Sequence, residues 1–497
     1  MSRATRWAIL LSILAVAARL IWIDQPFNDN WSWRQSDVAA IARNYFTGGF
    51  HFARPQIDWA GDQPGYVGTE FPILPFVAAV SYKIFGLHEW VGRVQAVILF
   101  AVSLPFFFLL VREIFGETAA LWAVFFYSFT PLNLFAGRAF IPDVPSLSLG
   151  IIGLYFFFRW IESEPDGRIR SISFFFSAFA ISLSILLKAP SAIIGAPLAC
   201  LAFQRFGKPP LRLGVALRNF WLWVFAAIAL VPSAVWYWHA HQIATQFYPY
   251  HFFGAGGIRI MHASWYLRIA REISTSTLTP IVLVIAIFGA VIARTTMRAR
   301  FVYWWFAAMI LFFIVVGYGN RHQWYQLPLV PIGTAFAGAG CAFVAQRTSR
   351  TVAVALSISL ITAFGFLAFL YVRPFYFSRA SVALRDLGLE LRATTPANAL
   401  IVAANNGDPT VFYYAERKGW HFLERDGIVI GDPIDSAQAI ADLEKLHHRG
   451  ASYLVLTWAT RWWLQYYKEF AQHLQANTNL VEETPEFIIY RLNPVTE

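Results

Sequence analysis

The stretch VGRVQAVILFAVSLPFFFLLV, residues 91–111, is apolar along most of its length and around the full circumference of a helix. About 20 such residues are needed to cross the hydrocarbon core of a bilayer as an α-helix. Similar runs recur along most of the chain, for example at 274–293, 301–317 and 351–372. Because soluble helices are rarely apolar on every side, the sequence predicts an α-helical, polytopic membrane protein.

The composition points to the same class. Of the 497 residues, 57% are hydrophobic and 14% are charged, whereas a soluble domain carries roughly a quarter charged residues. Cys200 and Cys341 both lie in apolar runs, which excludes a disulfide framework and a cysteine-based metal site. The net charge of +10 comes from Lys and Arg in short loops, so it indicates membrane topology and not nucleic-acid binding.

The basic residues cluster in a few short loops, which are expected on the cytoplasmic side of the membrane. The clusters are Arg3 and Arg6; Arg112; Arg159, Arg168 and Arg170; Arg205, Lys208, Arg212 and Arg218; Arg294, Arg298 and Arg300; Arg347 and Arg350. With every cluster inside, the apolar runs give about eleven spans, the first of them uncleaved. The spans are 7–23, 91–111, 118–138, 145–160, 172–187, 190–204, 219–238, 274–293, 301–317, 325–345 and 351–372.

The apolar run at 71–87 does not fit this count, because a further span there would place the later basic clusters outside. Pro72 and Pro75 interrupt it. We therefore expect a re-entrant or interfacial helix within a first external loop at 24–90. The alternative is a full span with a partner elsewhere in the chain.

The composition changes at about residue 373. Short β-rich runs occur at 399–404, 452–457 and 487–492. A helix is expected from Asp435 to Arg449, with Asp435 or Ser436 as its N-cap and Gly450 closing it. Alternating helices and strands predict a small α/β domain over 373–497. It follows an odd number of spans, so it should lie outside, after a membrane domain over 1–372.

Charged residues that the apolar background does not explain mark functional sites in membrane proteins. Several are expected at the external face, from loops far apart in sequence. They are Arg34, Asp37, Glu70, Arg138, Asp143, Lys188, Arg321 and His322, together with the polar Gln323 and Tyr325. A carboxylate can take a proton from an acceptor hydroxyl, and Lys, Arg and His can stabilise a departing phosphate. This set therefore suits transfer from a phosphate-linked, lipid-anchored donor.

Each residue also has a structural interpretation. Asp37 could cap a helix that opens at Ser36 or Asp37, and Asp143, between two prolines, could cap another. Glu70 could be a solvated loop charge. Lys188 and Arg138 could reach the lipid headgroups, and His322 could be an ordinary interfacial histidine. The functional interpretation rests on their coincidence at one face. No Walker loop, no GxGxxG after a strand and no HExxH motif is present in the sequence.

Five segments together resemble a known family. They are WRQSDVAAIARN (33–44), GTEFPILPFVAAVSYKIFGLHEWVGR (68–93), GRAFIPDVPSLSL (137–149), LLKAP (186–190) and HQWYQLPLVP (322–331). In order and spacing they resemble the GT-C superfamily glycosyltransferases, in the group that contains protein O-mannosyltransferases and bacterial aminoarabinose transferases of lipid A. Two positions depart from the pattern: Phe71 follows the Glu where a basic residue is common, and Ala189 replaces the Gly of a Lys-Gly-Pro segment.

The resemblance implies a polyprenyl-phosphate-sugar donor, an inverting transfer and a soluble external C-terminal domain. It implies Asp37 as catalytic base. The implied donor-phosphate residues are Arg138, Lys188, His322 and Tyr325, and the implied donor or acceptor residues are Glu70, Asp143 and Arg34. A divalent metal, Mg²⁺ or Mn²⁺, is a possible cofactor with Glu70 and Asp143 as candidate ligands, because oxygen ligands favour these ions over Zn²⁺.

The expected protein is a multi-pass glycosyltransferase of a bacterial inner membrane, embedded among membrane lipids with an external site. Its acceptor could be lipid A, a polysaccharide, another lipid or a protein. The rival interpretation is a transporter or flippase of lipid-linked sugars. Transporters place coupling charges near the midplane in paired repeats, and no such repeat is evident in the sequence. A third interpretation is a non-catalytic assembly or sensor protein that recognises its partner through the tail.

Overall fold

The computed structural model describes residues 2–163, 168–206, 217–252, 258–294 and 296–494. Lys208 and Arg212 of the predicted basic clusters lie outside the described residues. The chain forms two compact units, each built from segments that are separated in sequence. The first unit comprises Met1–Ile23, Arg93–Trp236 and Gly254–Pro374; the second comprises Asp24–Gly92, Tyr237–Phe253 and Phe375–Glu497.

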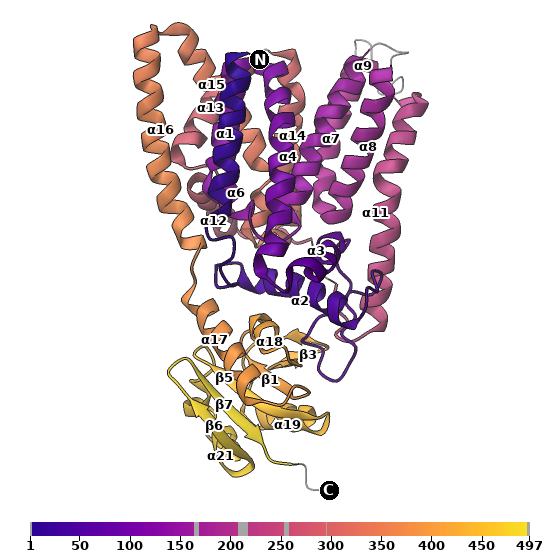
Figure 1. Cartoon of the computed structure of the whole chain (residues 1–497), viewed down its shortest axis with the longest axis vertical. Helices are drawn as coiled ribbons and strands as arrows, with labels where there is room; N and C mark the ends of the chain where they lie inside the picture. The colour runs from indigo at the N-terminus through magenta and orange to yellow at the C-terminus, as the bar shows by residue number, and fades with distance from the viewer. Residues whose placement is uncertain (1, 164–167, 207–216, 253–257, 295, 495–497) are drawn as a thin grey trace. The chain divides into compact units, whose positions relative to one another are not determined.

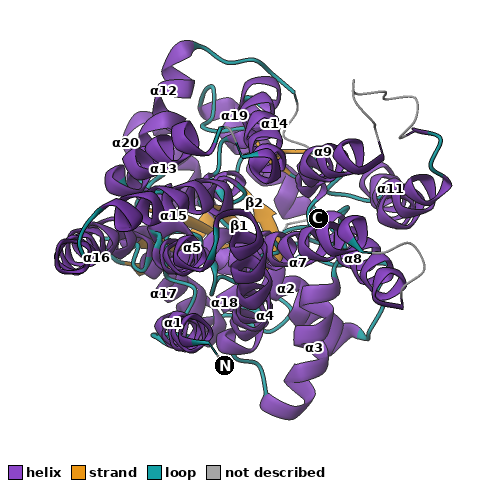
Figure 2. Cartoon of the chain, turned by 90° about the horizontal axis from the view of Figure 1, so that it is seen from above, coloured by secondary structure: helices purple, strands orange, loops and turns teal. Residues whose placement is uncertain are grey.

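The first unit is helical, and its long helices run side by side, with short helices between them (Figures 1 and 2). They are α1 (Arg3–Leu20), α4 (Glu89–Phe115), α5 (Glu117–Phe129), α6 (Pro131–Ala136), α7 (Asp143–Glu162), α8 (Arg168–Leu187), α9 (Gly195–Phe206), α11 (Phe220–Gln246), α12 (Ala263–Glu272), α13 (Pro280–Ala293), α14 (Arg300–Val316), α15 (Leu329–Arg347) and α16 (Arg350–Val372). The first residues of α4, up to Gly92, and the last residues of α11, from Tyr237, are assigned to the second unit.

Seven helices of the described residues are long and apolar enough to cross a membrane, or eight if the bent pair Ala263–Thr277 and Pro280–Ala293 is one span. Each of the eleven predicted spans coincides with a helix, but three of these helices do not meet the requirements for a full span. The α5 helix has 13 residues and ends before Pro131, and α9 has 12. The α1 helix carries three arginines, of which Arg19 is fully buried and donates to the carbonyl oxygens of Ala15 and Asn133.

Small residues allow the helices of the first unit to pack closely. A Cβ at Gly153 of α7 would lie 2.6 Å from the side chain of Ile181 in α8. A Cβ at Gly338 of α15 would lie 2.2 Å from the carbonyl oxygen of Ala119 in α5. Such contacts are typical of helix packing in membranes, where apolar burial alone gives no driving force between helices.

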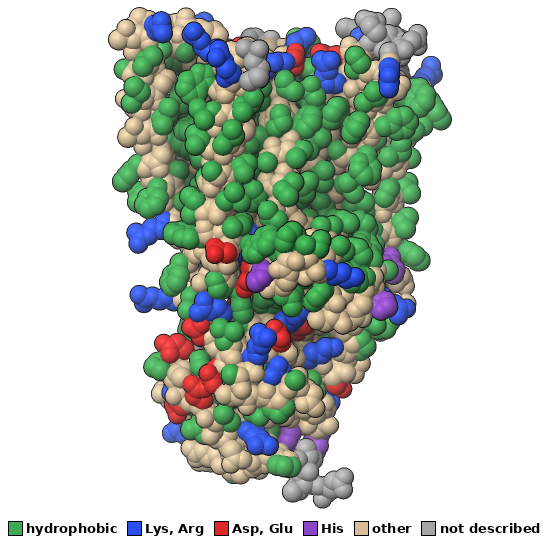
Figure 3. Space-filling view, in the orientation of Figure 1, with side chains coloured by type: hydrophobic (Ala, Val, Ile, Leu, Met, Phe, Trp, Pro, Cys, Tyr) green, Lys and Arg blue, Asp and Glu red, His purple; other side chains and the backbone are tan. Residues whose placement is uncertain are grey.

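The surface of this helical unit is suited to lipid. Apolar side chains cover the visible faces of its helices, and Lys and Arg side chains gather at the end that carries the N-terminus (Figure 3). The protein is therefore a multi-pass membrane protein, as predicted. That the basic end is cytoplasmic stays a prediction of the positive-inside rule.

The run at 71–87 forms the short helix α3 (Ile73–Phe85) in the second unit. Its 13 residues extend about 20 Å, which is less than the ~30 Å of a bilayer core. Val80 and Ile84 are exposed, whereas Ala79 and Tyr82 are buried. The one-sided burial is consistent with the predicted interfacial helix, and α3 is too short to span on its own.

The second unit contains a five-stranded sheet with strand order β2–β1–β5–β7–β6. Its strands are β1 (Leu400–Ala404), β2 (Lys418–His421), β5 (Ala451–Thr457), β6 (Thr478–Glu483) and β7 (Phe487–Leu492), and β3 (Glu424–Arg425) pairs with β4 (Ile428–Val429) in a separate hairpin. Strand β1 is parallel to β2 and β5, whereas β7 is antiparallel to β5 and β6. The helices are α2 (Ser32–Gly48), α17 (Arg379–Thr394), α18 (Thr410–Ala415), α19 (Ser436–His448), α20 (Trp463–Tyr466) and α21 (Lys468–Asn477).

Successive residues of a strand point to opposite faces of a sheet, and here the two faces bury different partners. On one face, Ile401 and Ala403 share a core with helices α17 and α18 and with Ile41 and Tyr45 of α2. On the other face, Val402 and Ala404 share a core with α19 and α21. The helix α2 of the first loop therefore packs into the same core as the tail. The second compact unit is accordingly larger than the predicted domain 373–497.

Candidate functional site

Asp37 lies inside helix α2 and does not cap it. The helix begins at Ser32, and Trp31 occupies the cap position without a side-chain hydrogen bond. The structural alternative, in which the helix opens at Ser36 or Asp37, is therefore wrong. Asp29, which precedes the helix, accepts a hydrogen bond from the backbone N–H of Trp31 instead.

The side chain of Asp37 is buried, with 3% of the residue exposed. Its Oδ1 accepts a hydrogen bond of 3.0 Å from the indole Nε1 of Trp59. Burial raises the pKa of Asp37 to about 7, while the nearby Arg34 charge and the Trp59 hydrogen bond oppose the increase. A carboxyl group with a pKa near neutrality is suited to general base catalysis at physiological pH.

Arg34 and Glu70 form a buried ion pair. Arg34 lies three residues before Asp37, on the same side of α2. Its Nη2 donates to both carboxylate oxygens of Glu70, at 3.0 and 2.8 Å, and the Thr69 hydroxyl donates to Glu70 Oε2 at 3.0 Å. These contacts make Glu70 a fixed partner of Arg34 and not a solvated loop charge.

In the first unit, Lys188 and Asp143 form a second buried ion pair. The Nζ of Lys188 lies 3.3 Å from Asp143 Oδ1 and 5.1 Å from the ring centroid of Tyr325. Asp143 begins α7, and Lys188 follows the last residue of α8. Reciprocal hydrogen bonds between Ser146 of α7 and Ser184 of α8 fix these two helices beside each other: each hydroxyl donates to the other residue's carbonyl, at 2.6 and 2.7 Å.

The remaining predicted donor residues have different surroundings. The His322 ring stacks on Trp324, with 4.4 Å between ring centroids, in the same turn as Tyr325. Arg138 is fully buried, and its Nη1 donates at 2.9 Å to the carbonyl oxygens of both Ile21 and Trp22. Arg138 therefore anchors the chain after α1, whereas Lys188 and Tyr325 contact each other directly. The proposed phosphate-binding roles of these residues stay predictions.

No group of three or more His, Cys, Asp or Glu side chains is placed to hold a metal within the part of the chain that the structure describes. The two predicted metal ligands each face a cation: Glu70 pairs with Arg34, and Asp143 with Lys188. A divalent metal at either position would therefore have to compete with Arg34 or Lys188 for its carboxylate. The Mg²⁺ or Mn²⁺ cofactor stays a prediction.

Trp59 is the residue of this site that the sequence did not reveal. It lies in the irregular segment QIDWAGD (56–62), which has no helical or strand periodicity. Asp58, next to it, pairs with Arg43 of α2 and accepts a hydrogen bond of 3.0 Å from Asn44. The neighbouring pairs on α2 thus hold the Trp59 segment against the helix that carries Asp37.

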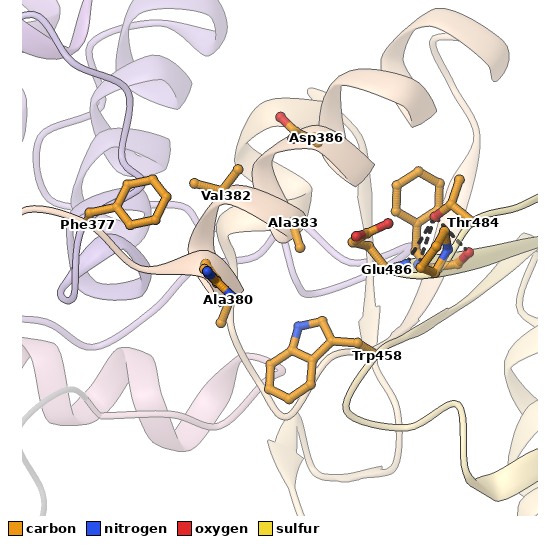
Figure 4. A pocket seen from close by; sticks show the side chains of 11 residues that line it. Phe377, Ala380, Val382, Ala383, Asp386, Trp458, Thr484 and Glu486 are labelled. Carbon is orange, nitrogen blue, oxygen red and sulfur yellow. Dashed lines mark hydrogen bonds between the residues drawn. The ribbon is translucent and has the colours of Figure 1, made fainter.

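A separate cavity of about 720 Å³ lies between α17, Trp458 and the β6–β7 turn. Figure 4 shows the side chains on its walls, which come from these three places in the C-terminal segment. The cavity is lined by Phe377, Arg379, Ala380, Val382, Ala383, Asp386, Trp458, Thr484, Pro485, Glu486 and Phe487. None of the predicted site residues is among them.

Comparisons with known proteins concern the fold and the class of protein. Residues 62–238 match the model of the dolichyl-phosphate-mannose-protein mannosyltransferase family. This match covers less than half of the chain. A curated relative, the putative mannosyltransferase YkcB of Bacillus subtilis (strain 168), is 24% identical over 159 residues, which are 31% of this chain. The match covers only 21% of that relative's length.

The fold of the chain is shared with solved structures over nearly its whole length. ArnT from Cupriavidus metallidurans in the apo state matches with a TM-score of 0.65 at 16% identity, covering 99% of this chain and 98% of ArnT. ArnT bound to undecaprenyl phosphate matches with 0.64 at 15% identity, covering 98% of each chain. The archaeal oligosaccharyltransferase AglB from Archaeoglobus fulgidus, in complex with an inhibitory peptide and a dolichol-phosphate, matches with 0.64 at 12% identity, covering 99% of this chain and 75% of AglB. The predicted fold class is confirmed, and the partial family match agrees with the predicted family.

Proposed function

We propose that this protein is an inverting membrane glycosyltransferase that moves a sugar from a polyprenyl-phosphate-linked donor to an acceptor at the external face, with Asp37 as general base. One observation carries the proposal: a carboxyl group inside α2, buried and hydrogen-bonded by Trp59, has its pKa raised to about 7. The family match, and the ArnT structure that holds undecaprenyl phosphate on the same fold, support the donor class.

In the proposed step, the Asp37 carboxylate takes the proton of an acceptor hydroxyl while that oxygen attacks the anomeric carbon of the donor sugar. The new carbon–oxygen bond forms on the face opposite the phosphate, so the configuration inverts. The bond between the anomeric carbon and the phosphate oxygen breaks, and its electron pair leaves with the polyprenyl phosphate. We assign stabilisation of that leaving phosphate to Lys188, whose ammonium group lies beside Tyr325.

We further propose a bacterial inner membrane as the location, with the tail outside, and an envelope molecule as acceptor: lipid A, a polysaccharide, another lipid or a protein. A transporter of lipid-linked sugars is less well supported. The matching structures include an oligosaccharyltransferase and an arabinofuranosyltransferase, and the buried pair Asp143 and Lys188 lies at the ends of α7 and α8.

The test is transfer by purified full-length protein in lipid nanodiscs. Radiolabelled mannose and aminoarabinose, each linked to undecaprenyl phosphate, serve as donors, and a delipidated envelope extract and a lipid extract serve as acceptors. We expect label to move to one acceptor with wild-type protein but not with Asp37→Asn. Movement of intact labelled donor between leaflets of proteoliposomes, without release of undecaprenyl phosphate, would contradict the enzyme and support the transporter.

A further inference from the structure

The turn after β1, in the C-terminal segment, is built around Asp408. The Oδ1 of Asp408 accepts a hydrogen bond of 2.9 Å from the backbone N–H of Thr410, which begins α18. Asn405 donates from its side-chain amide to the Asp408 carbonyl oxygen. The Oδ1 of Asn405 lies 2.9 Å from Nδ1 of His421, so that ring nitrogen carries the proton that it donates. Asp408, Asn405 and His421 thus form one hydrogen-bonded group.

The turn after β1 and His421 contact two residues next to Asp37 in space: Ser36 and Trp59. The Thr410 hydroxyl lies 3.3 Å from the hydroxyl of Ser36, the residue before Asp37. The ring of His421 contacts the ring of Trp59, with 5.3 Å between their centroids, and Trp59 is the hydrogen-bond donor to Asp37. A closed path of contacts therefore runs from Ser36 through the turn after β1 to His421, and back through Trp59 to Asp37.

The charges around Asp37 come from three elements. Arg34 of α2 is the nearby cation, and Asp58 and Asp408 are the nearby anions, with Arg43 paired to Asp58. Burial raises the pKa of Asp408 to about 6, so at neutral pH it is mostly ionised and repels the Asp37 anion. Burial lowers the pKa of His421 to about 3, so this histidine is neutral and does not offset the charge of Asp408.

We propose that the C-terminal segment completes the transferase site through Asp408, a positioning residue whose hydrogen-bonded turn and negative charge act on Asp37. The inference rests on the proposed function, in which Asp37 is the base. On this proposal, the C-terminal segment contributes to the transfer reaction itself and not only to recognition of a partner. The repelling anion raises the proton affinity of the Asp37 carboxylate, and the contacts through Ser36 and Trp59 hold that carboxylate in one orientation.

The variant Asp408→Asn tests the charge, because its side-chain oxygen can still accept from Thr410. Loss of the anion should lower the pKa of Asp37, so the acid limb of the kcat/KM profile should move to lower pH, by roughly one unit. Asn405→Ala opens the hydrogen-bonded group without changing charge. It should reduce kcat roughly tenfold while the acid limb stays where it is. The control Asp386→Asn, at an exposed carboxylate of the same segment, should change neither quantity.

A readout that needs no turnover separates this inference from the proposed function. Isotope-edited infrared titration of ¹³C-aspartate-labelled full-length protein gives the Asp37 carboxylate band by difference from Asp37→Asn. The band should titrate near pH 7 in wild type and at lower pH in Asp408→Asn. An unchanged midpoint in Asp408→Asn would overturn the inference even if Asp37 proves to be the base. A shifted midpoint in a protein that transfers no sugar would overturn the proposed function alone.

Discussion

At the scale of single residues, Asp37 balances opposing demands. Burial favours its neutral form and raises its pKa to about 7, whereas the proposed role as general base requires the ionised form. The folded-state pKa of Asp37 is above the unfolded value of about 3.9. At pH values between these two pKa values, folding is therefore accompanied by uptake of a proton. The contribution of Asp37 to stability is therefore lost as the pH rises through this interval.

The variant Asp37→Asn should lose activity but not stability. Asn keeps the oxygen that accepts from Trp59 but cannot take a proton, so transfer should fall by roughly two to four orders of magnitude. Above pH 7 the variant should melt at the wild-type temperature or higher, because the buried negative charge at position 37 is removed. Transfer assays with parallel melting curves at pH 6 and pH 8 measure both effects. Near-normal turnover would remove Asp37 from the chemistry.

A second prediction concerns the stability cost of replacing Lys188, which depends on its ion pair with Asp143. Replacing a lysine at the end of a span costs little stability when its ammonium group reaches water. Lys188, however, is 6% exposed and faces a carboxylate. Lys188→Met alone should cost about 3–5 kcal/mol, because it leaves a buried charge without its partner. The double variant Lys188→Met with Asp143→Asn should recover most of that stability. If Lys188 holds the phosphate, binding of undecaprenyl phosphate should stay weak in both variants; recovery of binding in the double variant would exclude that role.

At the scale of elements, the sequence predicted the strands with continuous β-rich runs and the helix with a clear N-cap residue. The runs predicted at 399–404, 452–457 and 487–492 are β1, β5 and β7. The helix capped by Asp435 is α19, where Asp435 accepts from the backbone N–H of Gln438 at 2.8 Å. Strand β6 was missed because it is a polar edge strand without alternation, and β2 because it has four residues. The start of α2 was missed because no side chain caps it.

Gly153 permits a prediction at this scale. A Cβ there would lie 2.6 Å from Ile181, so Gly153→Val should push α7 away from α8. These helices lead to Asp143 and Lys188. We expect a loss of about 1–3 kcal/mol and a longer, weaker ion pair. The matched control is Gly365→Val in α16, where a Cβ meets nothing within 4 Å. Thermal melting of both variants compares them, and equal effects would show that packing between α7 and α8 is not the cause.

At the scale of the whole molecule, sequence motifs found the charged residues but not their grouping. Arg34, Asp37 and Glu70 gather in the second unit, and Asp143, Lys188 and Tyr325 in the first. Trp59 and Asp408 join Asp37 through contacts between segments that are far apart in sequence, which no local pattern encodes. The same is true of the second unit, which combines the first loop with the tail.

The combination of the first loop and the tail in one compact unit predicts a feature of the topology that does not depend on the number of spans. Because α2 shares a core with α17 and with strand β1, the first loop and the tail must lie on the same side of the membrane. In a variant with Cys200 and Cys341 replaced by alanine, single cysteines at the exposed positions Gln63, His88 and Glu486 should all react with a membrane-impermeant maleimide in intact cells. A cysteine at Arg350, in a predicted cytoplasmic loop, should react only after permeabilisation.

The three reactive positions test two separate statements. If Gln63, His88 and Glu486 all react only after permeabilisation, the orientation is reversed but the compact second unit stands. If Gln63 and Glu486 react from opposite sides, the shared core of α2 and the sheet is contradicted, because a packed core cannot be divided by a bilayer. Equal reaction at Gln63 and His88 would also exclude α3 as a lone span, since the two positions lie before and after it in the chain.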